Sequence, residues 1–233
     1  MKVFARVFFL VFWLSAEYAA MAQQGTLLYS NPMATVDDIK DWVMEGPGKT
    51  ECKDGWTQIY SPGEKGHHLL WCPEEFPVSF VAQWEVKNLN PEAGLCIVFF
   101  SAKGIHGEDI FAPSLPKRDG RFKGYINGAI HNYHISYYAN GKNQPGRETA
   151  NLRKNPGFHK VQKGEAGIAA DSRDVHTILL VKEEGHIQLY VDKRKVIDWQ
   201  DHGVAWGAGK IGFRQMKWTR FAYRNFKVWS TSK

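Results

Sequence analysis

The sequence predicts an all-β protein, an antiparallel two-sheet sandwich of the jelly-roll type. Short segments of apolar or alternating residues recur along the chain, turn-forming residues separate them at short intervals, and a single segment has helical spacing. Because a strand points successive side chains to opposite faces, alternation of this kind is typical of strands with one buried face.

The helical segment comes first. Thr35 to Met44 (TVDDIKDWVM) carries Val36, Ile39, Trp42 and Val43 at helical spacing, behind a threonine that could cap it. We therefore expect one short amphipathic helix near the N-terminus.

Strands are expected through the rest of the chain. Trp84 and Trp229 fall on alternating apolar faces and are core candidates, and turn pairs such as Asn140-Gly141 and Glu184-Gly185 separate neighbouring strands. The expected strands are Val78–Val86, Leu95–Phe100, Ile130–Tyr138, Thr177–Lys182, His186–Val191, Val196–Trp199, Lys210–Gln215 and Phe221–Trp229.

A long loop precedes the strand at Ile130. Glycines and prolines interrupt Lys103 to Ala129 repeatedly, which excludes a helix or an unbroken strand there. Long loops inside compact domains are usually functional or disordered, and apolar residues such as Phe111 and Phe122 indicate a loop pinned to a scaffold. We expect a bound molecule to lie near this loop.

The N-terminus resembles an export signal. Lys2 and Arg6 precede an apolar run that is too short to cross a bilayer, and Ala20-Met21-Ala22 offers small residues where a signal peptidase cuts. We expect residues 1–22 to be a secretory signal and residues 23–233 to form one domain, secreted or periplasmic, with no membrane association after cleavage.

The charge balance favours anionic partners. The formal charge is +6, and removal of Lys2, Arg6 and Glu17 with the signal leaves a basic mature chain. Long-range attraction then favours a polysaccharide or oligosaccharide that carries uronic acid or sulfate, although scattered surface charge is the alternative. Export and the lack of a concentrated Lys/Arg tract argue against nucleic acid.

Three cysteines would meet an oxidising compartment. Cys52 and Cys72 flank a polar, glycine-containing segment, which suits a disulfide, whereas Cys96 lies in an apolar run and is expected to be a buried thiol. No Cys-x-x-Cys or tight Cys/His spacing indicates a metal site. We expect no cofactor, and the presence of a structural Ca²⁺ stays open.

Several segments resemble a known family. HTILLVKEEGHIQLYVDKRKVIDWQD (176–201) and GKIGFRQMKWTRFAYRNFKVW (209–229) are similar to the closing strands of concanavalin A-like lectin/glucanase sandwiches. With DWVMEGPG (41–48), GEDIFAPSLPKRDG (107–120) and IHNYHISYY (130–138), they resemble the YesU-like bacterial family, domain of unknown function 1961. The resemblance implies a jelly roll and a setting in bacterial polysaccharide breakdown, and it brings no catalytic residues with it.

Strict alternation along Ile130 to Asn140 divides this strand into two faces. One face would carry only hydrogen-bonding side chains, at 132, 134, 136, 138 and 140. Such a face is either solvent-facing surface or the floor of a groove, and the adjoining long loop favours the groove. In concanavalin-like sandwiches the concave sheet holds the glycan.

Two reaction classes are considered for this groove. Retaining glycosidases of the superfamily hold paired carboxylates in a Glu-x-Asp-x-x-Glu pattern, which is absent here, so hydrolysis is disfavoured. β-Elimination from a uronic acid needs a Tyr or His base beside a cation, and Ile130-His131 with Tyr137-Tyr138 faintly resembles jelly-roll lyase motifs. The accompanying Arg-x-Glu-x-Arg motif is missing.

The candidate site combines catalytic and binding roles. His134 would act as base or hydroxyl binder, Tyr138 as proton donor or stacking ring, and Arg214 as carboxylate clamp. The substrate-binding candidates are Asn132, Asn140, His106, Glu108, Asp109 and Trp206. His106, Glu108 and Asp109 could instead bind a cation or form an ordinary turn, Arg214 could pair structurally across strands, and Trp206 could belong to the core.

The function expected from these residues is engagement of an acidic polysaccharide, with a lyase favoured over a hydrolase if the protein is an enzyme. A non-catalytic carbohydrate-binding jelly roll is the first alternative. An accessory protein of a polysaccharide-utilisation system and a structural envelope protein are the others.

Overall fold

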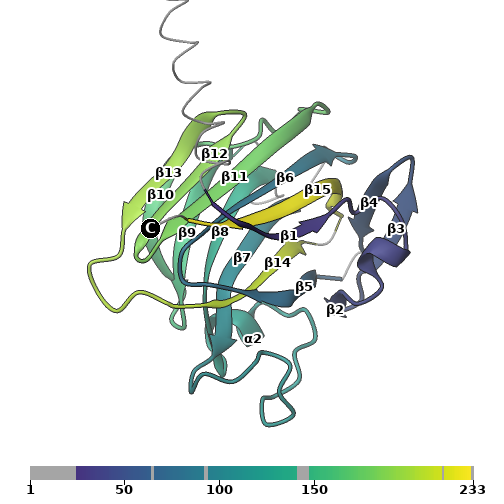
Figure 1. Cartoon of the computed structure of the whole chain (residues 1–233). Helices are drawn as coiled ribbons and strands as arrows, with labels where there is room; N and C mark the ends of the chain where they lie inside the picture. The colour runs from purple at the N-terminus through teal and green to yellow at the C-terminus, as the bar shows by residue number, and fades with distance from the viewer. Residues whose placement is uncertain (1–24, 64–65, 92–93, 141–146, 217, 232–233) are drawn as a thin grey trace, which may run out of the picture.

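The computed structural model describes residues 25–63, 66–91, 94–140, 147–216 and 218–231. In this part of the chain two antiparallel sheets face each other and form a sandwich (Figure 1). The all-β prediction is confirmed. The predicted signal at 1–22, and Gly141 of the predicted Asn140-Gly141 turn, lie outside the described residues.

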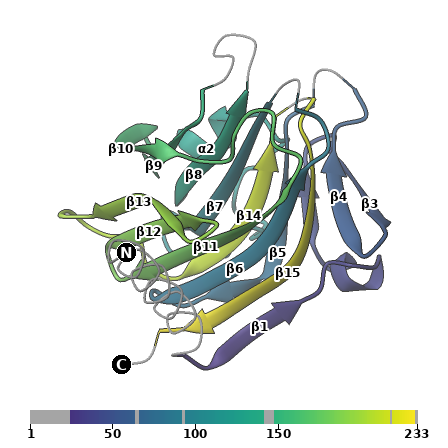
Figure 2. The same ribbon diagram turned by 90° about the horizontal axis from the view of Figure 1, so that it is seen from above.

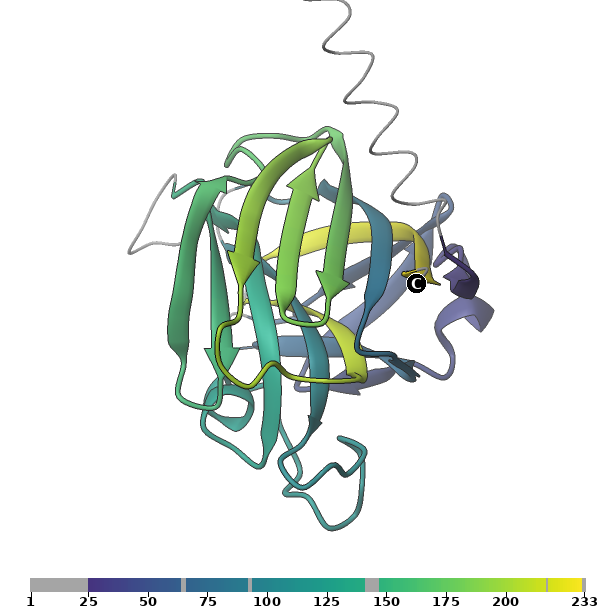
Figure 3. The same ribbon diagram turned by 60° about the vertical axis from the view of Figure 1, so that its left-hand side comes forward.

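Sheet A has the strand order β13-β12-β11-β6-β15-β4-β3. β4 pairs with the first part of β15, and β1 pairs with its later part, from Phe226 to Trp229. Figure 3 shows the three strands β11, β12 and β13 side by side in the front of the molecule. The strands of sheet A are β1 (Leu27–Asn31), β3 (Lys49–Lys53), β4 (Trp56–Tyr60), β6 (Phe80–Asn88), β11 (Val175–Glu183), β12 (His186–Val191), β13 (Arg194–Gln200) and β15 (Arg220–Ser230).

Sheet B has the order β10-β9-β8-β7-β14-β5-β2. Its strands are β2 (Val43–Glu45), β5 (His68–Phe76), β7 (Gly94–Gly104), β8 (Ile130–Asn140), β9 (Thr149–Asn155), β10 (His159–Ala166) and β14 (Gly209–Gln215). Seen from above, the short helix α2 (Lys123–Ile126) lies on the side of β8 that faces away from sheet A (Figure 2). We call this side the outer face of sheet B.

The main core lies between the sheets. Trp84 of sheet A contacts Phe213 of sheet B with ring centroids 5.2 Å apart, and Phe226 packs against both rings. Their neighbours along each strand point the other way, as pleating requires, so both sheets also carry outward-facing side chains. On sheet B those side chains build a second apolar cluster on the outer face.

The predicted N-terminal helix is much shorter than expected. Only Asp37–Ile39 form a single 3₁₀ turn, and Val43 and Met44 belong to β2 instead. Ile39 and Trp42 are buried as the helical spacing required, but Val36 is 69% exposed. The chain therefore buries these two residues by a turn and a short strand rather than along one helical face.

A bulge in β8 overturns the predicted strict alternation. Ser136 pairs with Ile97 and Tyr138 pairs with Cys96, so Tyr137 is an extra residue on β8. Tyr137 and Tyr138 consequently both pack in the core between the sheets. Side chains from Tyr138 onward are therefore shifted by one residue relative to the expected faces.

The predicted Cys52–Cys72 disulfide is contradicted, because both thiols are free. Cys52 lies on β3 of sheet A and Cys72 on β5 of sheet B, so the segment between them passes from one sheet to the other. Cys96 is also free and fully buried, as expected, and its sulfur contacts the hydroxyls of Tyr137 and Tyr223. Burial raises the pKa of the Cys96 thiol to about 12.

The described residues contain no helix long and apolar enough to cross a membrane.

Candidate functional site

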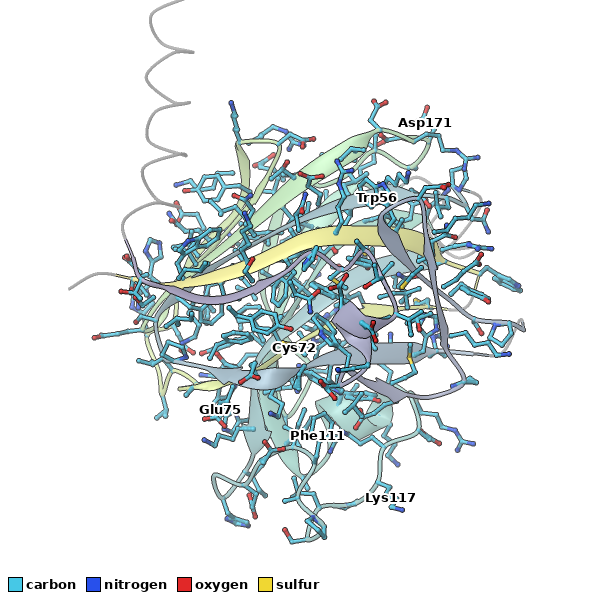
Figure 4. The ribbon with its side chains drawn as sticks, turned by 45° about the vertical axis from the view of Figure 1, so that its right-hand side comes forward. Trp56, Cys72, Glu75, Phe111, Lys117 and Asp171 are labelled. Carbon is cyan, nitrogen blue, oxygen red and sulfur yellow. The ribbon has the colours of Figure 1, made fainter. Side chains whose placement is uncertain are left out.

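The loop that follows β7 covers part of the outer face of sheet B. Ile110 and Tyr125 of this loop pack on Trp71, Phe99 and Ile97 of the sheet, which confirms that the loop is pinned to a scaffold. Figure 4 places Phe111 and Lys117 of the same loop at one end of the sandwich, with Lys117 at its outer margin. The side chains of the sheet that this loop covers are shielded from a ligand, and only those outside the covering loop are accessible.

A buried ion pair fastens the cover. Arg118 of the loop donates from Nη2 to Glu45 Oε1 of β2 over 2.7 Å, and the two side chains are 6% and 9% exposed. Glu45 also accepts from Trp71 Nε1 at 2.9 Å, and Arg118 donates to the Ile110 carbonyl at 2.8 Å. Burying both charges is offset only where the pair is well hydrogen-bonded, and four hydrogen bonds serve this pair.

His134 lies on the outer face, as alternation predicted, but it is covered. Its ring stacks on Phe99 and Phe158, with centroids 4.8 and 5.9 Å away, and Phe122 meets its edge at 5.4 Å. It is only 3% exposed. Burial, and then the cations Arg214 and Arg153, hold the pKa of His134 well below its usual value, so the ring is neutral.

A chain of side-chain amides fixes the His134 tautomer. Asn132 Nδ2 donates to the Tyr125 carbonyl at 2.8 Å, which leaves Asn132 Oδ1 to accept from Asn155 Nδ2 at 2.7 Å. Asn155 Nδ2 also lies 2.8 Å from His134 Nδ1 and must donate to it, so the ring proton lies on Nε2. His134 therefore presents a donor rather than a free basic nitrogen, which disfavours its predicted role as base.

Arg214 shares the outer face with Asn132 and His134, as the sequence predicted, but it is 2% exposed. Its guanidinium lies 4.5 Å from the centre of the Phe122 ring and donates to the Gly120 carbonyl at 3.2 Å. Burial lowers the pKa of Arg214 to about 10. The covering loop therefore closes over this cation, which lacks the exposure expected of a clamp.

Tyr138 and Asn140 do not lie on the outer face, and the β8 bulge is the reason. Tyr138 is 1% exposed, packs edge-on against Phe221, and donates to the Ala170 carbonyl at 3.0 Å. Asn140 donates to the Pro91 carbonyl. The bulge thus removes both residues from the predicted groove.

The three polar loop residues do not form one site. The Glu108 carboxylate accepts from the backbone N–H of His106 at 3.0 Å, which closes a local turn. Asp109 instead pairs with Lys210 of β14 at 3.0 Å, and this hydrogen bond helps to lower its pKa against the opposing effect of burial. Within the described ranges, no three His, Cys, Asp or Glu side chains gather as metal ligands would.

Trp206 packs on the protein itself. Its ring stacks on His131 with centroids 4.6 Å apart, and Lys154 Nζ lies 4.8 Å from the ring centre. The backbone N–H of Trp206 donates to the Tyr133 hydroxyl, which itself donates to Asp201. These contacts give Trp206 a structural role in the segment between β13 and β14, which Figure 3 shows crossing in front of sheet B.

A row of cations that the sequence analysis missed crosses the outer face of β8, β9 and β10. Arg153 of β9 lies opposite His134 of β8 on one side and Lys160 of β10 on the other, so the three side chains share this face. One step along, Asn151 lies opposite Ser136 and Lys163. Arg147 donates to the Ser136 hydroxyl at 3.2 Å. We call Arg147, Arg153, Lys160 and Lys163 the basic strip.

The basic strip is partly accessible and held in place. Arg153 is half-buried, its guanidinium lies 3.7 Å from the centre of the Phe158 ring, and Nη1 donates to the Phe158 carbonyl at 2.8 Å. Burial and the neighbouring Arg147 lower the pKa of Arg153. In the described part of the chain, Arg153, Lys160 and Lys163 form no ion pair with a carboxylate.

A separate pocket lies at the edge of the sandwich where β2 and β3 meet. Its volume is about 320 Å³, and none of the predicted site residues lines it. The lining residues are Ile39, Trp42, Met44, Gly48, Lys49, Thr50 and Leu70.

The fold and its covered sheet define a galectin-like jelly-roll sandwich. A crystal structure described as a protein of unknown function with galectin-like fold from Bacillus subtilis has a TM-score of 0.84 and 35% identity, covering 89% of this chain and 97% of that one. A carbohydrate-binding module, CBM66 from Bacillus subtilis, has a TM-score of 0.53 and 14% identity, covering 82% and 96% of the two chains. At that identity the likeness concerns the fold.

The chain belongs to the family described as domain of unknown function 1961, whose model matches residues 26–228. It is 35% identical over 215 residues to the uncharacterized protein YesU of Bacillus subtilis (strain 168), covering 89% of this chain and 97% of that protein. The family resemblance found in the sequence is thereby confirmed.

Proposed function

We propose that this protein binds an anionic polysaccharide across the outer face of β8, β9 and β10, at the basic strip. The observation that carries the proposal is that Arg153, in line with Lys160 and near Arg147, forms no ion pair with a carboxylate among the described residues. Arg153 has lost part of its hydration by burial and is repelled by Arg147, so an anion bound to Arg153 would offset both unfavourable energies. A planar guanidinium suits carboxylate or sulfate groups in particular.

The neighbouring polar groups suit the uncharged part of a sugar. Ser136 and Asn151 lie between the cations on the same face, and each is 7% exposed, so only this small exposed part would reach sugar hydroxyls. Arg153 is held over Phe158, which reduces the side-chain entropy that binding would otherwise cost. The fold likeness to a carbohydrate-binding module supports a sugar ligand, and the predicted export signal supports a role outside the cytoplasm.

The proposal is binding without cleavage at this face. His134 directs its basic nitrogen at Asn155, and Tyr138 packs in the core, so neither is arranged to exchange a proton with a uronic acid. A lyase acting here would produce new ultraviolet absorbance from an unsaturated uronide. We expect none from the wild-type protein with acidic polysaccharides.

Affinity electrophoresis with pectate, alginate, heparin and neutral dextran tests the proposal. We expect retardation by at least one acidic polymer, weaker retardation at high salt, and none by dextran. R153M should weaken binding to that acidic polymer about 10-fold or more, because it removes a charged hydrogen-bonding group.

Arg220 offers a matched control on sheet A. Its guanidinium also lies over an aromatic ring, that of Tyr60, at 4.6 Å, but it is paired with Glu51 at 2.9 Å. R220M should bind the polymer as the wild type does. Equal binding by folded R153M and wild type would contradict the proposal.

A further inference from the structure

A serine, a histidine and an aspartate form a hydrogen-bonded series far from the covering loop. Ser172 lies in the loop between β10 and β11, His176 is on β11, and Asp192 directly follows β12. Figure 4 places the adjacent Asp171 at the end of the sandwich opposite Phe111 and Lys117. Ser172 Oγ lies 2.7 Å from His176 Nε2, and His176 Nδ1 lies 2.5 Å from Asp192 Oδ2.

The carboxylate fixes which nitrogen of His176 carries the proton. An ionised carboxylate only accepts, so Nδ1 donates to Asp192 and Nε2 presents its lone pair to Ser172. The Ser172 hydroxyl therefore donates to His176. Asp192 is itself held by the backbone N–H of Thr177, which donates to Oδ1 over 2.8 Å and leaves Oδ2 aimed at the ring.

The series is open to a substrate. Ser172 is half-buried, and the His176 and Asp192 side chains are 13% and 48% exposed. The backbone N–H of Asp174 donates to Ser172 Oγ at 3.3 Å, so it would stabilise negative charge that develops there as the proton leaves. A nucleophile, a base within hydrogen-bond reach and a group that orients the base are the three parts of an acyl-transfer site.

We propose that Ser172 and His176, positioned by Asp192, hydrolyse O-acyl esters. Ser172 Oγ bonds to the ester carbonyl carbon while its proton passes to His176 Nε2. The tetrahedral intermediate then expels the alcohol oxygen, which takes that proton and leaves as the free alcohol. Water attacks the acyl-serine, gives one proton to His176, and releases the carboxylic acid as that proton returns to Ser172 Oγ.

A second histidine–aspartate pair provides a matched control. His186 Nε2 lies 2.7 Å from Asp198 Oδ1, and the side chains are 39% and 41% exposed. In the described residues no serine hydroxyl is hydrogen-bonded to His186. H186N therefore removes a comparable surface pair without touching the proposed nucleophile.

The test is labelling with a fluorophosphonate probe, peptide mass spectrometry, and 4-nitrophenyl acetate hydrolysis by the full chain. We expect the label on Ser172, loss of both signals in S172A by at least ~100-fold, and wild-type behaviour in H186N. D192N, at an unchanged melting temperature, should slow labelling of Ser172, which a purely structural role would not do.

Two outcomes overturn the proposal. One is a label on another residue or on none, and the other is hydrolysis that persists in S172A. S172A removes only a hydroxyl, so it decides the matter even where substitution of His176 impairs folding. Glycan binding is independent: S172A should bind acidic polymers as the wild type does, and R153M should hydrolyse the ester at the wild-type rate.

Discussion

The outer face of sheet B has two parts that follow opposite principles. On β5, β7 and β14 it carries Trp71, Phe99 and Ile97, and a loop with its own Tyr125 shields these side chains from water. On β9 and β10 it carries cations and amides instead. The difference shows that one sheet face can be core at one side and solvent-accessible at the other, depending on whether a loop covers it.

The largest loss of stability is expected from breaking the buried Arg118–Glu45 ion pair, which holds the covering loop on sheet B. R118M leaves the Glu45 carboxylate buried without its cation and should lower the free energy of unfolding by about 3–5 kcal/mol. The double variant E45Q/R118M removes both charges and should recover much of this loss. Chemical denaturation of the three proteins measures both changes.

The Arg121–Asp119 pair is the exposed counterpart in the same loop. Its side chains are 85% and 62% exposed, so R121A should change stability by no more than about 0.5 kcal/mol. A similar loss in R118M and R121A would mean that the cover is not fastened at Glu45.

The second largest loss of stability is expected at low pH, because the folded chain buries His68 and His134 in their neutral form. Burial lowers the pKa of His68 from 6.5 to about 4, so between these pH values the unfolded chain binds more protons than the folded one. Stability is therefore complete above pH 6.5 and falls as pH drops, by about 3 kcal/mol at pH 4 from His68 alone. His134 adds a loss of the same sign.

Unfolding titrations from pH 7 to pH 4 measure this effect. H68F should flatten the pH dependence, because it removes the buried group whose pKa differs between the folded and unfolded chains. A profile that is the same in H68F and wild type would show that His68 is not the group responsible.

The smallest loss of stability among these predictions is expected at Trp206, where one substitution compares a structural role with a role in glycan binding. W206A removes the stacking on His131 and the contact with Lys154, and should cost about 1–2 kcal/mol of stability. Affinity for the acidic polymer should stay within about twofold, because Trp206 packs on the protein. A tenfold weaker affinity in folded W206A would place the glycan over Trp206 instead.

Strands with clear apolar alternation were predictable from the sequence. His186–Val191 has the bounds of β12, and Val78–Val86 and Phe221–Trp229 largely coincide with β6 and β15. The strands β9 and β10 were missed because TANLRKN and HKVQKGEA bury few apolar residues and their pairing is interrupted by register shifts. Polar strands at the end of a sheet give a weak periodic signal.

Part of the site was predictable for the same reason. Alternation placed Asn132, His134 and Arg214 correctly on one face, since it depends only on local geometry. The position of Tyr138 depends on how β8 pairs with β7, and the sequence of one strand does not contain that information. Arg153 was missed with its strand, although basic residues recur at 147, 153, 154, 160 and 163.

The extra residue in β8 gives this strand two separate duties. Up to Ser136 the strand supplies the floor of the proposed glycan-binding face, and from Tyr138 onward it closes the end of the interior against Phe221. Deletion of Tyr137 would make Ser136 and Tyr138 consecutive residues of a regular strand, so Tyr138 would still pair with Cys96 and point inward, and the interior would lose one aromatic ring. The extra residue thus adds a second neighbouring tyrosine to the interior and adds no aromatic ring to the outer face.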